Sequence, residues 1–196
     1  MKQWSKEKFL SENTWFHGTL RVYAIDMIVN GINAYKNRNT PSDFGRGLYL
    51  CPNEEWALSY ATQRVKDRIE SVELEPNDGV VIQFEFLPYD YVGRFGLKYY
   101  SGMTKEFAKD VFFNWRHPAI PYPKRWHDMI FGPMTDGKQM QLMAKFKNHE
   151  ISKTDVIKEL LKPKEDWQLL IRSQILCNEL KVVRTFNLKG DDVDVI

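Results

Sequence analysis

The chain has 196 residues, 43% of them hydrophobic and 14% aromatic, which is enough to bury the core of one compact domain. Its 28 basic and 26 acidic residues give a net charge of +2, so there is no global electrostatic footprint for DNA or RNA. The two cysteines, Cys51 and Cys177, lack the spacing of a disulfide framework or a four-ligand zinc site. No apolar run is long enough for a secretory signal or a membrane span, so we expect a cytoplasmic protein without membrane contacts.

The first strand and helix are predicted near the N-terminus. A strand over residues 14–18 leads into a helix over 22–30, and Gly31 is placed to cap its C-terminal end. The spacing of four apolar residues is typical of an amphipathic helix, because it puts them on one face: Val22, Ile25, Ile28 and Val29.

A second strand and helix follow a polar loop. The strand covers residues 47–51, and the side chain of Asn53 is expected to cap the helix after it. That helix carries a predicted buried stripe formed by Trp56, Tyr60 and Ala61. After a turn at residues 77–79, the alternation over 80–86 predicts a half-buried strand.

The remaining elements mix strands with helices. Residues 89–126 are irregular and predict a helical insertion, in which Thr104 starts a helix over 105–115. A short strand covers 128–131, and Ser152 with Asp155 resembles a capping box for a helix that Pro163 ends. The last elements are a strand, a helical turn and a strand, over 167–171, 173–179 and 181–188. Because regular β-α-β alternation is missing, we expect an α+β fold in a single domain spanning residues 1–196.

Several familiar catalytic motifs are absent from the sequence. It contains no glycine-rich dinucleotide fingerprint, no Walker loop, no nucleophile elbow and no zinc-protease helix. The histidines at positions 17, 117, 127 and 149 lack the short spacings of a metal site on one element. We therefore expect chemistry that does not depend on a metal.

Two short segments stand out instead, WFHGT at residues 15–19 and SDFGRGLYL at residues 42–50. In the first, His17 stands at the end of a strand and Gly18 lets a flat ligand approach the backbone closely. In the second, two glycines flank Arg46 just before the strand that carries Tyr49. Glycines leave backbone amides open to an anion, and Arg46 supplies positive charge for a phosphate.

These segments resemble the first two motifs of the ADP-ribosyltransferase superfamily, in the branch built around a histidine and a tyrosine. The chain is most similar to a bacterial family of uncharacterised ADP-ribosyltransferase-like domains. Three further stretches carry this resemblance in the same order: NEEWALSYA, DMIFGPMTDG at residues 128–137 and QLLIRSQILCNELKVV at residues 168–183. The resemblance implies two small sheets flanking an NAD cleft, with NAD as a substrate.

The resemblance also implies roles for individual residues. His17 would contact the adenosine-side ribose of NAD, Gly18 would offer its backbone to the nicotinamide amide, and Tyr49 would stack on the nicotinamide ring. The implied NAD-binding set is His17, Gly18, Thr19, Arg46, Gly47 and Tyr49. The implied catalytic set is Gln168, Tyr49 and His17.

The third motif position falls on Gln168, where many active relatives have Glu. A glutamate binds the ribose 2′-hydroxyl and also balances the positive charge that grows on the ribose, whereas glutamine does only the first. The missing charge is worth about 1 to 3 kcal/mol of transition-state stabilisation. Just upstream, Glu165 and Asp166 are candidates for the general base toward the acceptor.

Each of these residues also has a purely structural interpretation. His17 and Tyr49 could be core residues, and the paired glycines could form only a turn that enters a strand. Gln168 could be a polar residue on an edge strand that faces water. Basic and aromatic residues in the insertion either bind single-stranded nucleic acid or form a solvated helix packed by its aromatics: Lys105, Lys109, Trp115, Arg116, Lys124, Arg125 and Trp126.

The expected function is that of an NAD-dependent mono-ADP-ribosyltransferase acting on a macromolecule, with nucleic acid slightly favoured over protein. The family setting suggests a bacterial or phage-related toxin or defence protein with an antitoxin partner. Two alternatives stay open: an NAD glycohydrolase that uses water as the acceptor, and a binding module without catalytic activity, which the Gln168 position keeps in consideration.

Overall fold

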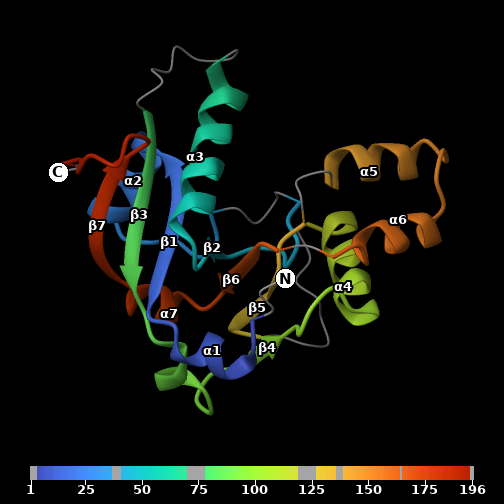
Figure 1. Ribbon diagram of the computed structural model, residues 1–196, viewed down its shortest axis with the longest axis horizontal. Coiled ribbons are helices and arrows are strands. Elements are labelled where there is room, and N and C mark those ends of the chain that lie inside the picture. Colours follow the sequence, from blue (N-terminus) through green and yellow to red (C-terminus); the bar gives the residue numbers. More distant parts are fainter. Residues whose placement is uncertain are drawn as a thin grey trace.

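A computed structural model of the protein (Figure 1) describes residues 4–36, 41–69, 78–118, 127–135, 139–163 and 165–194. The described residues form two small β-sheets and seven α-helices, so the fold is α+β, as the sequence predicts. None of the helices in this part of the chain is both long and apolar enough to cross a membrane.

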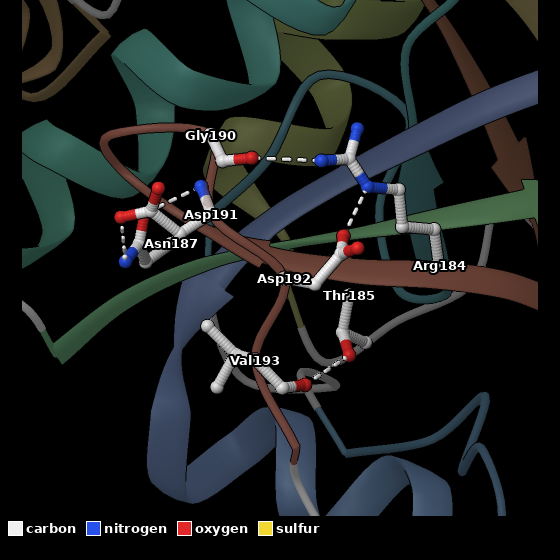
Figure 2. A network of polar contacts seen from close by, with 7 residues as sticks. All are labelled: Arg184, Thr185, Asn187, Gly190, Asp191, Asp192 and Val193. Atoms are coloured by element: carbon white, nitrogen blue, oxygen red, sulfur yellow. Dashed lines mark hydrogen bonds and ion pairs between the residues drawn. The ribbon is translucent and has the colours of Figure 1, made fainter.

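The first sheet has three antiparallel strands in the order β1-β3-β7, with bounds Thr14–Leu20, Gly79–Glu85 and Lys181–Asn187. β3 is almost fully buried, rather than half-buried as its alternation predicts, because it is the central strand and is covered on both faces. Figure 2 shows how the chain after β7 turns back along that strand. Val193 exchanges backbone and side-chain hydrogen bonds with Thr185, and Arg184 contacts Gly190 and Asp192. This return covers the β7 edge, and the opposite edge, β1, meets the second sheet.

The second sheet has four strands in the order β2-β6-β5-β4, with bounds Leu48–Leu50, Trp167–Ile171, Met129–Pro133 and Leu97–Tyr99. β4 runs parallel to β5, and the other pairs are antiparallel. β6 is a central strand, so all five of its side chains are buried. Tyr49 pairs with Leu170, and Gly132 pairs with Gln168.

Three apolar clusters hold the sheets and helices together. The main cluster contains side chains from both sheets, among them Trp15, Ile82, Phe84, Phe131 and Leu169. A second cluster covers the other face of the second sheet with α4 (Lys105–Arg116), α5 (Gln139–Lys147) and α6 (Lys153–Leu160). These three helices lie on the side of the molecule away from the first sheet (Figure 1), so the helical layer extends beyond residues 89–126. In the third cluster, α3 (Glu54–Ile69) packs on the first sheet.

The helix starts predicted from local sequence are confirmed. The Asn53 side chain accepts hydrogen bonds from the first turn of α3, and Thr104 caps α4. Ser152 and Asp155 form a complete capping box on α6. The remaining short elements are α1 (Lys6–Ser11), η2 (Pro88–Tyr91) and α7 (Gln174–Asn178).

The predicted faces of the two N-terminal helices need correction. In α2 (Arg21–Val29) the buried residue is Ala24, and three members of the apolar face are exposed to solvent: Val22, Ile25 and Val29. In α3 the predicted stripe is wrong for Tyr60, which is 53% exposed. The buried stripe of α3 consists of small residues, Ala57, Ala61 and Val65, because this helix lies very close to β1.

Candidate functional site

Among the described residues, one backbone bridge joins the two sheets, between β1 and the end of β2. Phe16 and Cys51 exchange N–H···O hydrogen bonds of 2.8 and 2.9 Å. If this antiparallel pairing continued, its register would set Gly18 opposite Tyr49. Instead, the Tyr49 carbonyl oxygen lies 2.7 Å from Nδ1 of His17. The two strands therefore separate directly after the bridge, with the His17 imidazole at the point of separation.

This hydrogen bond fixes the tautomer of His17. A carbonyl oxygen only accepts, so Nδ1 carries the proton and donates it to Tyr49. Burial lowers the pKa of His17, and the positive charge of Arg64 acts in the same direction, whereas the bond to Tyr49 opposes them. The ring is therefore neutral at pH 7, and Nε2 is left as a hydrogen-bond acceptor.

The backbone of Gly18 faces the gap between the separating strands. Alternate residues of an antiparallel strand turn their N–H and C=O groups to the same side, so Gly18 shares the outward side with Phe16. The missing side chain has a structural reason, because a Cβ at Gly18 would overlap the carbonyl oxygen of Ala57 in α3. Thr19, next in the strand, is buried. The close packing of α3 therefore explains why residue 18 is a glycine. A ligand in the gap would meet the backbone N–H and C=O groups of Gly18.

The Tyr49 side chain is held by the loop before its own strand. Its hydroxyl donates to the Gly45 carbonyl oxygen at 2.7 Å and accepts from the Phe44 N–H at 3.0 Å. Burial raises the pKa of this hydroxyl above its ordinary value, so it stays protonated. The ring is half-buried against the second cluster. Tyr49 is thus partly a core residue and partly exposed.

The two glycines around Arg46 have packing and backbone reasons, contrary to the expectation from sequence. Gly45 has a φ of 81°, which a residue with a side chain rarely adopts. A Cβ at Gly47 would overlap Leu170 in β6. Arg46 is half-buried, and its guanidinium lies 5.0 Å from the ring centre of Tyr35. The loop is therefore a tight turn that enters β2, as its structural interpretation predicts.

Gln168 lies in the interior of the second sheet, and the interpretation as a solvent-facing residue on an edge strand is wrong. It belongs to the central strand β6 and is only 5% exposed. Continuing the β2–β6 register by one residue sets it opposite Cys51, next to the bridge between the sheets. Its Nε2 donates to Oδ2 of Asp43 at 2.8 Å and to the Pro133 carbonyl oxygen at 3.3 Å.

Asp43 is a site residue that the sequence reasoning missed, although it lies inside the SDFGRGLYL segment. Its buried carboxylate accepts from Gln168 in β6, from the backbone and hydroxyl of Thr135 at 2.9 and 2.7 Å, and from the Trp115 indole at 3.2 Å. Burial raises the pKa of Asp43, and these four hydrogen bonds oppose the rise. The usable signal was an acidic residue directly before a Phe-Gly turn.

Arg172 is the second residue that was missed. It follows β6, is 3% exposed, and donates to the Phe44 carbonyl oxygen. Burial lowers its pKa. The sequence signal was the alternation of Gln168, Leu170 and Arg172, which puts the three side chains on one face of the strand.

Two cavities lie near these elements, one beside Arg172 and one along β4. A cavity of about 20 Å³, room for one water molecule, is lined by Arg172 together with Tyr100 and Asp110. A larger surface hollow of about 480 Å³ lies along β4 beside Lys6. Neither of the two is lined by His17, Tyr49 or Gln168.

The candidate acceptor-side residues lie on the loop before β6. Glu165 is exposed, and Asp166 is half-buried with its carbonyl oxygen 2.8 Å from the Met134 N–H. Burial, with a smaller contribution from the negative charge of Asp166, raises the pKa of the Cys51 thiol to about 12. Asp166 therefore lies near the end of β2, on the Gln168 side of the bridge.

The proposed nucleic-acid surface is only partly present in the structure. Trp115 is buried and bonded to Asp43, so it cannot stack on a base, which fits a helix packed by its aromatics. Three basic side chains of α4 are exposed: Lys105, Lys109 and Arg116. Lys124, Arg125 and Trp126 lie outside the described residues. Within the described ranges, no three His, Cys, Asp or Glu side chains gather as they would around a metal ion.

The fold and this cluster define an α+β domain whose two sheets separate at a histidine–tyrosine contact. The chain belongs to the family described as "Protein of unknown function (DUF3990)", whose model matches residues 16–182. The matched segment contains every site residue discussed above. No curated protein and no solved structure matches the chain.

Proposed function

We propose that the protein is an NAD-dependent mono-ADP-ribosyltransferase that holds NAD where β1 and β2 separate. The observation that carries this proposal is the hydrogen bond from His17 to the Tyr49 carbonyl oxygen, directly beside the bridge between the sheets. It joins the two motifs that resemble those of the ADP-ribosyltransferases, although 32 residues of sequence separate them. Gln168, the third motif position, is next in register to the same bridge.

The separated strands offer groups that match parts of NAD. Nε2 of neutral His17 accepts a hydrogen bond from a hydroxyl of the adenosine-side ribose. The outward N–H and C=O of Gly18 are complementary to the carboxamide of nicotinamide, which has an accepting carbonyl oxygen and a donating NH2 group. The exposed part of the Tyr49 ring provides a surface for the cationic nicotinamide ring, an interaction worth about 0.5 to 2 kcal/mol. Arg46 supplies positive charge for the diphosphate.

The reaction breaks the bond between the nicotinamide nitrogen and C1′ of the ribose. Nicotinamide leaves as a neutral molecule with the bonding electrons, and positive charge develops on the ribose. The side-chain oxygen Oε1 of Gln168 accepts a hydrogen bond from the 2′-hydroxyl and orients the sugar. The acceptor then forms a bond to C1′ while Asp166 or Glu165 takes its proton, so one ADP-ribosyl group is transferred for each nicotinamide released.

We propose a macromolecular acceptor and test nucleic acid first, because Lys105, Lys109 and Arg116 are exposed on α4. The expected cellular role is that of a bacterial or phage-related toxin or defence protein in the cytoplasm, held inactive by an antitoxin protein.

The test is incubation of the purified protein with adenylate-labelled NAD and cell extract, followed by separation of protein, RNA, DNA and small molecules. Label on a macromolecule, with an equal amount of nicotinamide released, is the expected result. Label in free ADP-ribose alone would identify a glycohydrolase. Absence of nicotinamide release would overturn the enzymatic proposal in favour of a binding module.

Transfer should depend on His17. The asparagine of the His17→Asn variant can still donate an amide N–H to the Tyr49 carbonyl oxygen, but it has no atom at the position of Nε2, so labelling should fall about tenfold or more. His149→Asn is the matched control, since His149 is exposed and has a φ of 60°, a conformation that asparagine tolerates. Equal labelling by the two variants would contradict the assigned site.

A further inference from the structure

The carboxylate of Asp43 and the amide of Gln168 form a buried pair that the motif comparison does not explain. Both side chains are 5% exposed, and they come from positions 125 residues apart in the sequence. Their contact joins the loop before β2 to the central strand β6.

The contact fixes which end of the Gln168 amide points inward. Both partners of Nε2, the Asp43 carboxylate and the Pro133 carbonyl oxygen, only accept hydrogen bonds. The nitrogen must therefore face them, and a flipped amide would set oxygen against oxygen. The oxygen Oε1 accepts no hydrogen bond from any of the described residues, which leaves it for a ligand hydroxyl.

The same contact brings a negative charge to the motif position. Gln168 is neutral where many active ADP-ribosyltransferases have Glu, but the Asp43 carboxylate lies 2.8 Å behind its amide nitrogen. A carboxylate that accepts from an amide N–H polarises that amide and makes its oxygen a stronger acceptor. Water is largely excluded from the pair, so the charge is screened little.

We infer that Asp43 is a positioning residue for the transfer reaction. It orients the Gln168 amide through the hydrogen bond to Nε2, and its carboxylate supplies the negative charge that the neutral glutamine lacks. This inference rests on the proposed function. A purely structural role would be limited to anchoring the loop through Thr135 and Trp115, whose contacts do not depend on Gln168.

The Asp43→Asn variant separates charge from anchoring. The asparagine oxygen can keep the bonds from Gln168 and from the Thr135 N–H, and its amide can donate to the Thr135 hydroxyl. Only the Trp115 indole loses its acceptor. Thr135→Ala is the matched control, because it removes one hydrogen bond to Asp43 and leaves the carboxylate in place.

The experiment measures kcat and KM for nicotinamide release, with thermal melting as a check of folding. Asp43→Asn should lower kcat by about tenfold to hundredfold with little change in KM, whereas Thr135→Ala should stay within about threefold of the wild type. The double variant Asp43→Asn/Gln168→Glu returns one carboxylate to the pair and should recover most of kcat.

Three results would overturn the inference. An active wild type with an equally active Asp43→Asn variant refutes it and leaves the proposed function intact. A folded double variant whose kcat is below a tenth of the wild-type value refutes the charge argument. This comparison is the deciding one if Asp43→Asn alone does not fold. No nicotinamide release by the folded wild type removes the proposed function and the inference together.

Discussion

Under the proposed function, replacing Gln168 by glutamate is expected to give no faster nicotinamide release, even though many active ADP-ribosyltransferases have Glu at the motif position that Gln168 resembles. The new carboxylate would face Asp43 at the 2.8 Å distance of the present hydrogen bond. Two like charges at that distance repel each other by about 6 kcal/mol at an effective dielectric constant of about 20. The pair would therefore hold one proton, so its net charge would equal that of the wild-type pair.

The sign of the stability change follows from this shared proton. An unfolded chain releases the proton of the new glutamate near pH 4.3, whereas the folded pair keeps it, so the variant loses stability as pH rises above that value. The difference from the wild type should grow by up to about 1.4 kcal/mol per pH unit until the pair titrates. Burial raises the pKa of Asp43 in the wild type too, and subtracting the wild-type curve isolates the added carboxyl group.

Urea denaturation of Gln168→Glu and wild type between pH 5 and pH 8 measures this difference, and nicotinamide release should stay within about threefold of the wild-type rate. Gln141→Glu, an exposed substitution on α5, is the control and should show no such pH dependence. A stability difference that does not change with pH, together with release more than about tenfold faster, would refute the reasoning.

Three further predictions concern the parts around the site. Gly18→Ala should destabilise the protein by about 1 to 3 kcal/mol in urea denaturation, because the new methyl group overlaps α3; an unchanged midpoint would contradict the packing of that helix on β1. Burial lowers the pKa of His17, so wild-type stability should fall as pH drops below about 6.5, and His17→Asn should flatten that part of the curve; parallel curves would count against a neutral imidazole at this position. Burial raises the pKa of both Cys51 and Cys177 to about 12, so iodoacetamide at pH 8 should label them only after denaturation, as mass spectrometry would show; rapid labelling of the native protein would argue otherwise.

Local chemistry made much of the secondary structure predictable. Asn53, Thr104 and Ser152 cap their helices through side-chain bonds to the next few residues, so the information lies within one turn. The strand over 167–171 has the predicted bounds because its apolar run is bounded by turn signals.

Helix faces were harder to predict, since they depend on what each helix meets. Tyr60 lies on the solvent side because Gly18 lets α3 approach β1 through Ala57 and Ala61. Val22 is exposed on α2 although its spacing is that of a core-facing residue. The spacing of apolar residues within a helix cannot indicate that a glycine on another element lets that helix pack more closely.

Only the motif residues of the candidate site were predictable from the sequence, and not the long-range contacts that hold Gln168. His17 and Tyr49 were found from short motifs, and they do meet. The partner of Gln168 was not found, because Asp43 is 125 residues away and nothing in the local sequence links the two. The local sequence suggests a ligand-binding reason for the glycines beside Arg46, whereas turn geometry and the side chain of Leu170 require them.

Nicotinamide release from NAD by the purified wild-type protein, compared with His17→Asn and His149→Asn, tests the central claim most directly. The proposed function predicts steady release by the wild type and by His149→Asn, and a loss of about tenfold or more in His17→Asn. Release that is absent from the folded wild type, or equal in all three proteins, would contradict an NAD site at the separation of β1 and β2.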